Sequence, residues 1–347
     1  MGKTTRTITL CAAVAAVMAG CATERNAEMA IVKISRVVYA ALAEGREACG
    51  ANLGWAVVQN ARTGEVLCTE MVKAKAVRNA PREPWRYEPI ELGGLVLPFL
   101  AGKAIFEGVA TTNTAFDVSS EKRGGVLIGD SVFGRNELLL SEIIKYSSNR
   151  GGASLAMALG TNKATSVLMN FGFSANGSVL EKGNPDAWLV WLGMGRGVCG
   201  TGLQIASAFS AIANGGMLFD AWRERGNEKH HLFDAVTTNT CAAICEMLRA
   251  AVRTDGTGRT EAVEGIDVAG KTATVQLKEI PPFYKGEVYA PRFRSMFAGF
   301  FPVGEDIYSV LVVFELPEGA NTKNADAGLV AAPVFAKIAR GMANIMK

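Results

Sequence analysis

The chain has 347 residues, of which 49% are hydrophobic and 38 are glycine, and this composition fits a globular protein with one large or two ordinary domains. Its 36 basic and 33 acidic residues give a formal net charge of +3. A charge so close to zero gives no electrostatic reason to expect a nucleic-acid partner.

Residues 1–20 have the pattern of a targeting segment. A basic region with Lys3 and Arg6 precedes an apolar run, which has the length of a signal-peptide core and is short for a bilayer span. The stretch VMAGC, which ends at Cys21, resembles the lipobox of bacterial lipoproteins, where the cysteine is lipidated. An ordinary secretory signal with an incidental cysteine is the alternative. We expect a lipoprotein signal peptide over residues 1–20, then the lipidated cysteine and a short tether over residues 21–26.

Residues 27–347 are predicted to form one α+β domain. Its first element is an amphipathic helix that ends at Gly45, because apolar residues recur there at spacings of three and four. These residues are Ile31, Ile34, Val38 and Leu42. A strand over Trp55–Gln59 and a return strand over Glu65–Thr69 follow, joined by turn residues.

The middle of the domain, from about Pro98 to Leu248, is dominated by helical patterns and glycine-rich loops. Later, Phe297–Val303 and Ile307–Leu316 are apolar on both faces, as central strands are. Pro333 is expected to start a final helix. The apolar face of that helix carries Val334, Ile338, Met342 and Ile345. Strands at both ends of the domain predict a sheet built from remote segments, with the helical middle as its own subdomain.

The cysteines and histidines predict no metal site. Outside the targeting segment the cysteines are Cys49, Cys68, Cys199, Cys241 and Cys245, an odd number that cannot pair completely. Cys241 and Cys245 are within geometric reach of a bridge, but we interpret the five mostly as small buried residues. His230 and His231 are the only histidines, so they supply neither a full ligand set nor a Ser-His-Asp triad. No cofactor is expected.

Five segments carry a family resemblance through their order along the chain. They are WAVVQNARTGEVL (55–67), SSNRGG (147–152), GMGRGVCGTGLQIASAFSAIANGG (193–216), AGKTATVQ (269–276) and FAGFFPV (297–303). Together they resemble the transpeptidase domain of penicillin-binding proteins, especially the class B enzymes of division and elongation, which cross-link peptidoglycan stem peptides. The resemblance covers nearly all of residues 27–347. It implies the penicillin-binding/serine β-lactamase-like fold, in which helices cover an antiparallel sheet and a helical subdomain is added.

In this family a serine and a lysine at i,i+3 on one helix act as nucleophile and base. When Pro98-Phe99 of the stretch ELGGLVLPF is aligned with the family's Pro-Phe, Gly94 stands at the serine and Leu97 at the lysine. A shifted alignment puts Glu91 at the serine and Gly94 at the lysine. It requires three inserted residues and also supplies no serine, so we reject it.

The resemblance assigns the other site residues by motif. Ser147 and Asn149 match the Ser-x-Asn motif, Lys271 and Thr272 match the Lys-Thr-Gly strand, and the backbone N–H groups of Gly94 and Thr274 would form the oxyanion hole. More ordinary interpretations stay open. Lys271 could form a salt bridge or cover apolar surface, and Ser147 and Asn149 could hold a loop.

Ala273 replaces the glycine of the third motif. Its methyl group is expected to project into the space that a reacting serine needs, where the smaller side chains at positions 94 and 97 could accommodate it.

The leading hypothesis is a catalytically impaired or inactive homologue that serves peptidoglycan assembly as a scaffold, regulator or stem-peptide binder. It would be lipid-anchored on the periplasmic side of a bacterial cell envelope, with division or elongation proteins as possible partners. The alternative is an active D,D-transpeptidase or β-lactam hydrolase with a non-standard nucleophile, for which Ser147 with Lys271 as base is the candidate.

Overall fold

The computed structural model describes residues 28–78, 80–175, 184–220, 231–234, 236–253, 255–258, 263, 265–277, 291–317 and 325–346. The predicted signal peptide and Cys21 lie outside the described residues, as does His230.

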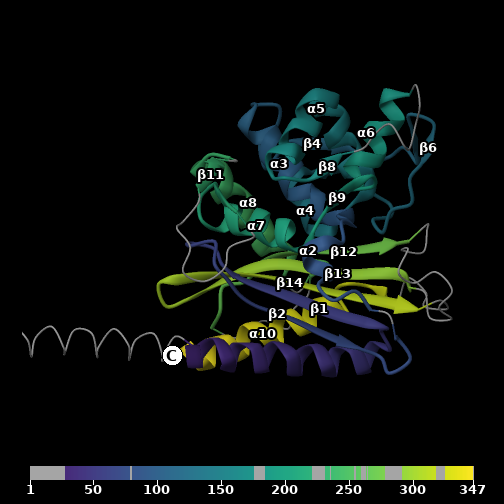
Figure 1. The fold of residues 1–347 in the computed structure, drawn as a ribbon. Coiled ribbons are helices and arrows are strands. Elements are labelled where there is room, and N and C mark those ends of the chain that lie inside the picture. Colours follow the sequence, from purple (N-terminus) through teal and green to yellow (C-terminus); the bar gives the residue numbers. More distant parts are fainter. Residues whose placement is uncertain are drawn as a thin grey trace, which may run out of the picture.

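A five-stranded antiparallel sheet forms the centre of the molecule, with the strand order β12-β13-β14-β1-β2 (Figure 1). The strands are β1 (Leu53–Asn60), β2 (Val66–Lys73), β12 (Ala269–Gln276), β13 (Pro291–Val303) and β14 (Asp306–Pro317). Strand β1, the first along the chain, pairs with β14, the last. This pairing confirms the prediction of a sheet built from remote segments. Strand β2 ends at Lys73, four residues beyond the predicted Thr69.

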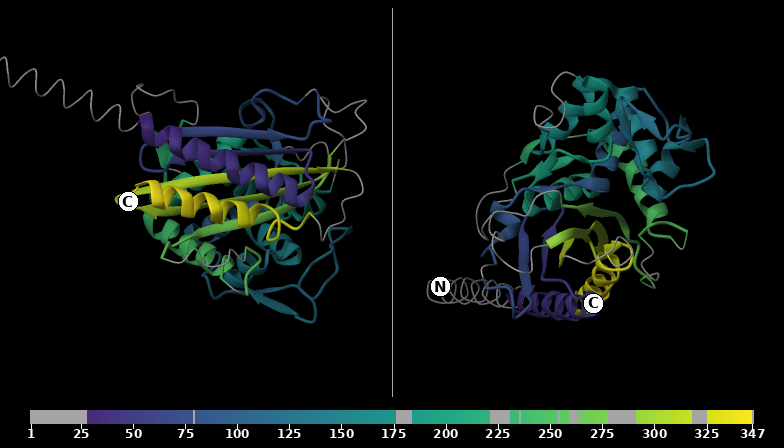
Figure 2. Two further views of the ribbon diagram at one scale, coloured as in Figure 1. Left: turned by 90° about the horizontal axis from the view of Figure 1, so that it is seen from below. Right: turned by 90° about the vertical axis from the view of Figure 1, so that its right-hand side faces the viewer.

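Two helices cover one face of the sheet, the N-terminal helix (residues 28–49) and α10 (Ala331–Met346). Figure 2 shows them side by side beneath the strands. The predicted end at Gly45 is wrong. That glycine lies inside the helix, where a β-carbon would stand 2.4 Å from Cγ2 of Val334, so its lack of a side chain permits close packing against α10. Pro333 is the third residue of α10, a first-turn position where its missing N–H has no helical partner to lose.

The helical subdomain covers the other face of the sheet (Figure 1). Its helices are α3 (Leu97–Phe106), α4 (Leu140–Tyr146), α5 (Asn149–Asn170), α6 (Pro185–Gly193), α7 (Gly202–Ala213) and α8 (Thr238–Ala251), preceded by α2 (Pro84–Tyr87) and the 3₁₀ turn η1 (Gly93–Val96). Short strands complete it: β3 (Ile90–Glu91), β4 (Ala115–Asp117), β5 (Lys122–Arg123), β6 (Val126–Leu127), β7 (Glu137–Leu139), β8 (Ser174–Ala175), β9 (Val198–Gly200), β10 (Met217–Phe219) and β11 (His231–Asp234). This arrangement confirms the predicted helical middle and α+β class.

Separate hydrophobic cores lie on the two faces of the sheet. The core under the subdomain centres on Phe99 of α3, whose ring lies 4.6 Å from that of Phe171 and 5.7 Å from that of Phe209, measured between centroids. The core on the opposite face joins the N-terminal helix and α10 to β13 and β14. Alternate side chains of each central strand enter opposite cores, which is why these strands are apolar on both faces.

The cysteines of the described residues are free thiols. Cys241 is buried, as predicted, whereas the other four are half-buried. Burial raises the pKa of Cys68 and Cys241 to about 12, so both thiols stay protonated at neutral pH and are poor nucleophiles. In the described part of the chain, no helix has both the length and the apolar character that a bilayer crossing requires.

Close packing between the two lower helices yields a testable expectation. A β-carbon on Gly341 of α10 would stand 2.3 Å from Cγ1 of Val37. Gly341→Ala should therefore lower the free energy of unfolding by about 1–3 kcal/mol, although alanine favours helix more than glycine does. Chemical denaturation measures this loss. In a Val37→Ala background the space is open, so the same substitution should lose most of its cost; an unchanged cost would contradict this packing.

Candidate active site

A cleft of about 630 Å³ lies between the helical subdomain and strand β12 at the edge of the sheet. Residues of all three predicted motifs line it, and each motif comes from a different element. Gly93 and Gly94 come from η1, Ser147 and Asn149 from the junction of α4 and α5, and Thr272 and Thr274 from β12. The structure thus brings together the motif residues that the sequence only places in order.

Two glycines allow η1 to approach its neighbours. Gly93 has a φ of +51°, and a β-carbon there would stand 2.7 Å from Cγ2 of Val275 on β12. A β-carbon on Gly195 would stand 2.0 Å from the carbonyl oxygen of Gly93, while the N–H of Gly93 donates to the carbonyl of Gly195 at 3.3 Å. Side chains at either position would push η1 away from the cleft wall. Sequence reasoning missed Gly195, although it lies inside one of the quoted segments.

Gly94 faces the polar groups of the other two motifs. A β-carbon built on Gly94 would stand 2.8 Å from Oγ of Ser147, 3.0 Å from the carbonyl oxygen of Thr272 and 3.5 Å from Nζ of Lys271. The distance to Ser147 is too short for any side chain to be added without a shift. Three polar groups, from Ser147, Thr272 and Lys271, therefore surround the space beside Gly94.

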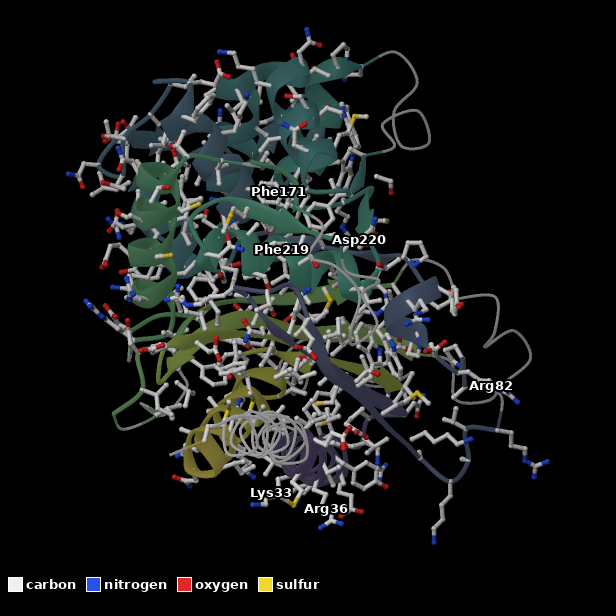
Figure 3. All side chains as sticks on the ribbon, turned by 60° about the vertical axis from the view of Figure 1, so that its left-hand side comes forward. Lys33, Arg36, Arg82, Phe171, Phe219 and Asp220 are labelled. Carbon is white, nitrogen blue, oxygen red and sulfur yellow. The ribbon has the colours of Figure 1, made fainter. Side chains whose placement is uncertain are left out.

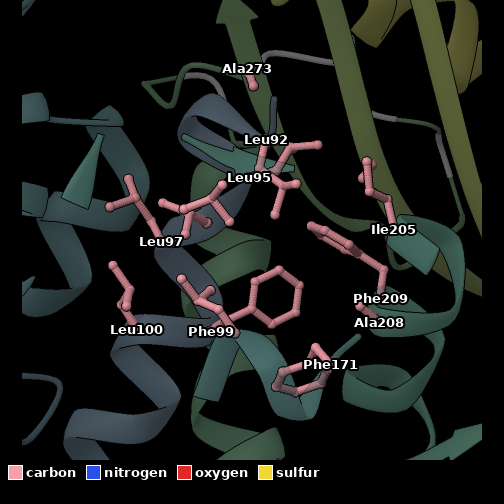
Figure 4. Packing of buried hydrophobic residues seen from close by; sticks show 14 of the residues in the cluster. Leu92, Leu95, Leu97, Phe99, Leu100, Phe171, Ile205, Ala208, Phe209 and Ala273 are labelled. Carbon is pink, nitrogen blue, oxygen red and sulfur yellow. The ribbon is translucent and has the colours of Figure 1, made fainter. Parts of the chain in front are cut away.

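Leu97, which the sequence analysis aligned with the family's lysine, belongs to the hydrophobic core. It is 2% exposed, and its Cδ2 lies 2.8 Å from where a β-carbon of Gly152 would be, so it packs directly on α5. Figure 4 shows it among the apolar side chains of this cluster, with Leu95 and Leu100. An apolar side chain here stabilises the start of α3 and presents no base to the cleft.

Ala273 lines the cleft together with Gly94, and its methyl group lies next to Gly93. The methyl carbon is 3.5 Å from the β-carbon position of Gly93, and it is not among the nearest atoms to that of Gly94. Side chains on a strand alternate, so Ala273 shares a face with Lys271 but lies two residues further along β12. It packs against η1 at the edge of the core (Figure 4), whereas the nearest atoms to the β-carbon position of Gly94 belong to Ser147, Thr272 and Lys271.

Ser147 has an unusual backbone conformation. Its φ of 55° and ψ of 41° are left-handed, and it is the only non-glycine residue with positive φ in the described part of the chain. It ends α4, and Ser148 then begins α5 as its N-cap by accepting from the N–H of Gly151 at 3.0 Å. A left-handed residue between two abutting helices aims the Ser147 hydroxyl at β12. Such strain is a frequent mark of functional sites.

Asp130 holds this junction in place and was not found from the sequence. Its Oδ2 accepts from Oγ of Ser148 at 2.6 Å and from the N–H of Arg150 at 2.8 Å. Beside it, Nδ2 of Asn149 donates to the carbonyl of Gly129 at 2.8 Å. Loop holding, one of the two interpretations of Asn149, is therefore part of its role. The Asn149 side chain is nevertheless exposed and lines the cleft.

Lys271 is the only completely buried lysine of the described residues, with 0% exposure. Its Nζ donates to Oγ of Ser147 at 2.6 Å and to the carbonyl of Thr272 at 3.1 Å, and among the described residues it makes no ion pair. Burial without a neighbouring carboxylate lowers the pKa of Lys271 to about 7. At neutral pH the amine therefore exists in both protonation states, as a general base requires.

The two threonines of β12 are held by hydrogen bonds on either side of the cleft floor. Oγ1 of Thr272 bonds Oγ1 of Thr257 at 3.0 Å, and Oγ1 of Thr274 accepts from the N–H of Ala327 at 3.0 Å.

One further charged pair went unrecognised in the sequence: Arg294 donates to Oε1 of Glu315 at 2.7 Å, and both side chains are at least 94% buried. In the described part of the chain, no cluster of three or more His, Cys, Asp or Glu side chains is placed to hold a metal.

Comparison with known proteins decides the family. The model of the penicillin-binding protein transpeptidase domain matches residues 54–340. The chain belongs to this family. It is 26% identical over 316 residues to peptidoglycan D,D-transpeptidase FtsI of Buchnera aphidicola, covering 83% of this chain and 53% of that protein. It is 28% identical over 331 residues to penicillin-binding protein PbpB of Mycolicibacterium smegmatis, covering 85% of this chain and 50% of that protein. The chain thus spans about half the length of these curated relatives.

Solved structures confirm the fold. A Burkholderia pseudomallei penicillin-binding protein 3 transpeptidase domain without ligand superposes with a TM-score of 0.71 at 24% identity, covering 89% of this chain and 93% of that one. A peptidoglycan glycosyltransferase from Burkholderia ambifaria gives a TM-score of 0.72 at 24% identity, covering 89% and 94%. The predicted penicillin-binding fold is therefore correct.

The pKa of Lys271 predicts a pH dependence of stability. Unfolding raises this pKa from about 7 to about 10.4, so between these values the unfolded chain binds more protons and stability rises with pH. Below pH 7 both states are protonated and the burial cost is complete. In Lys271→Met this contribution is absent. The stability of the wild type minus that of the variant should grow by about 2 kcal/mol between pH 7 and pH 9.

Denaturant titrations of both proteins at several pH values measure that difference in unfolding free energy. The contributions of other titrating groups, such as the cysteines, are the same in both proteins and cancel. A constant difference across this range would mean that Lys271 is not desolvated as its burial indicates.

Proposed function

We propose that this chain is a penicillin-binding protein homologue without acyl-transfer activity, which binds peptidoglycan stem peptides as a scaffold or regulator of cell-wall assembly. The observation that carries the proposal is the geometry at Gly94. Its missing side chain would stand within 3.5 Å of Oγ of Ser147 and Nζ of Lys271, so the family's site is assembled around an absent nucleophile. Without the serine, and with a leucine at the base position, only binding and the oxyanion hole remain to act on a ligand.

An open cleft supports a binding role over a purely mechanical one. Leu95 and Leu97, which could have blocked it, are buried in the core instead. The cleft keeps polar groups from three elements, with the exposed Asn149 and the backbone of β12 among them. An extended peptide could hydrogen-bond along β12, because this strand is the edge of the sheet.

Absence of covalent labelling is the direct expectation. Purified protein incubated with a fluorescent penicillin and run on a denaturing gel should show no bound label, whereas a transpeptidase with its serine, treated in parallel, should be labelled. Stoichiometric label on this chain would overturn the proposal of an inactive site.

Peptide binding is the positive expectation. Calorimetry with a pentapeptide that ends in D-Ala-D-Ala should show saturable binding, and Asn149→Ala should weaken it about 5- to 10-fold through loss of one hydrogen bond. Asn170→Ala is the matched control because Asn170 lines a different pocket. Thermal denaturation separates lost binding from lost folding, since Asn149 also bonds Gly129. No heat of binding in a folded wild type would favour a scaffold without a ligand.

A second candidate is an acyl-enzyme with Ser147 as nucleophile, favoured by the 2.6 Å contact between Oγ of Ser147 and Nζ of Lys271. Neutral Lys271 would take the hydroxyl proton while Oγ bonds to the lactam carbonyl carbon, and the leaving nitrogen would take that proton as the C–N bond breaks. This candidate predicts penicillin labelling that disappears in Ser147→Ala. The obstacle is position: Ser147 sits on a strained turn between helices rather than at the start of α3.

We further propose that residues 1–20 are a lipoprotein signal peptide, that residues 21–26 comprise a lipidated Cys21 and a tether, and that residues 27–347 act on the periplasmic side of a bacterial cell envelope. The pattern VMAGC supports this assignment. We propose proteins of division or elongation as partners, on the resemblance to the class B enzymes. A cell-wall context is supported by the similar FtsI of Buchnera aphidicola, which is named a peptidoglycan D,D-transpeptidase.

A further inference from the structure

We infer that the outer face of the N-terminal helix is a contact surface for an anionic lipid bilayer. This inference rests on the proposed lipid anchor at Cys21. The surface, called here the basal face, consists of Met29, Val32, Lys33, Arg36 and Tyr39 in the first three turns of the helix.

The basal face combines apolar and basic side chains at helical spacing. Met29, Val32 and Tyr39 are 55%, 50% and 52% exposed, although large apolar side chains elsewhere in this helix are buried against the sheet. Lys33 and Arg36 lie between them and extend away from the body of the molecule (Figure 3). Exposed apolar residues interspersed with basic ones are typical of helices that lie on membrane surfaces.

The neighbouring helix adds to the same end of the face. The N-terminal helix and α10 run antiparallel, because Gly45 meets Val334 and Gly341 meets Val37. The C-terminal end of α10 therefore lies beside the first turns of the N-terminal helix (Figure 1). It contributes Arg340, which is exposed, and Met346, which is 37% exposed.

Charge is distributed unevenly along the N-terminal helix. Near its start, Lys33 and Arg36 outnumber the single acidic Glu28, whereas near its end Glu44 and Glu47 outnumber the single basic Arg46. Lys337 donates to Glu44 at 2.6 Å and so neutralises part of the acidic end. An anionic surface would attract the start of the helix and not its end, by on the order of fivefold in partitioning for each basic residue. This complementarity selects anionic lipid over a neutral or basic partner.

The proposed anchor would hold that same end at the membrane. Six residues lie between Cys21 and the start of the helix at Glu28. The seven Cα–Cα steps across them span at most about 24 Å, less than the roughly 33 Å length of the helix. A tether so short gives the basal face a high effective concentration at the bilayer. The helical subdomain and the cleft lie beyond the sheet from this face, so the contact would turn the cleft away from the lipid.

Side-chain footprinting tests the inference without altering the protein. The mature lipidated chain is reconstituted into vesicles of phosphatidylglycerol and phosphatidylethanolamine, or of phosphatidylcholine alone, and oxidised by hydroxyl radicals. Met29 is compared with Met169 on the helical subdomain, which is 63% exposed and serves as the matched control. Oxidation of Met29 relative to Met169 should fall at least threefold in the anionic vesicles only, and high salt should restore it.

Charge reversal supplies the control variants. Lys33→Glu with Arg36→Glu should abolish the protection of Met29, whereas Lys75→Glu with Arg78→Glu, an equal change at exposed positions elsewhere, should leave it intact. A Met29 to Met169 ratio that is equal in both vesicle types would overturn the basal face as a lipid contact. Failure of the proposed lipid anchor would give a different result: in a density gradient the chain would not float with either kind of vesicle.

Discussion

The hydrogen bond from Lys271 to Ser147 joins the two halves of the molecule at the candidate site. Lys271 projects from the sheet and Ser147 from the helical subdomain, 124 positions earlier in the chain, and their polar atoms meet at 2.6 Å. The amine is completely buried, so its hydrogen bonds to Ser147 and to the carbonyl of Thr272 are what offset its removal from water. Lys271 thereby joins β12 to the strained turn at Ser147, and Gly94 of η1 lies beside both polar groups.

How far the sequence predicted the site can be judged residue by residue. Motif order was enough to bring Gly94, Ser147, Asn149, Lys271 and Thr272 to one cleft, because each motif lies at a fixed place on the fold. It could not predict Asp130, since a single acidic residue in a loop reveals its partners only when the α4–α5 junction is formed. The direction of the Ala273 methyl group could have been predicted. Strand alternation puts it on the face of Lys271, and the structure places it 3.5 Å from the β-carbon position of Gly93.

Two helix boundaries differ from the prediction, each for its own reason. Glycine often ends a helix and proline often begins one. Packing against α10 instead places Gly45 inside the N-terminal helix, and Pro333 is accommodated in the first turn of α10 two residues after its start. Local helix propensity is a weak guide where two helices pack closely, because a glycine can then be required for the close approach of the neighbouring helix and need not mark a helix end. The same logic explains Gly152, whose missing side chain makes room for Leu97.

The packing at Gly94 and Leu97 opposes the serine and the lysine that the family's motif would place there. A serine at position 94 would bring its β-carbon within 2.8 Å of Oγ of Ser147, so Ser147 would have to rotate or leave its left-handed conformation. A lysine at position 97 would bring a charge into a core where the leucine is 2% exposed and packs on Gly152. Each change alone costs stability and restores only half of the catalytic pair. Under the proposed function, the packing around Gly94 and Leu97 therefore opposes single substitutions toward the serine and lysine of the family's motif.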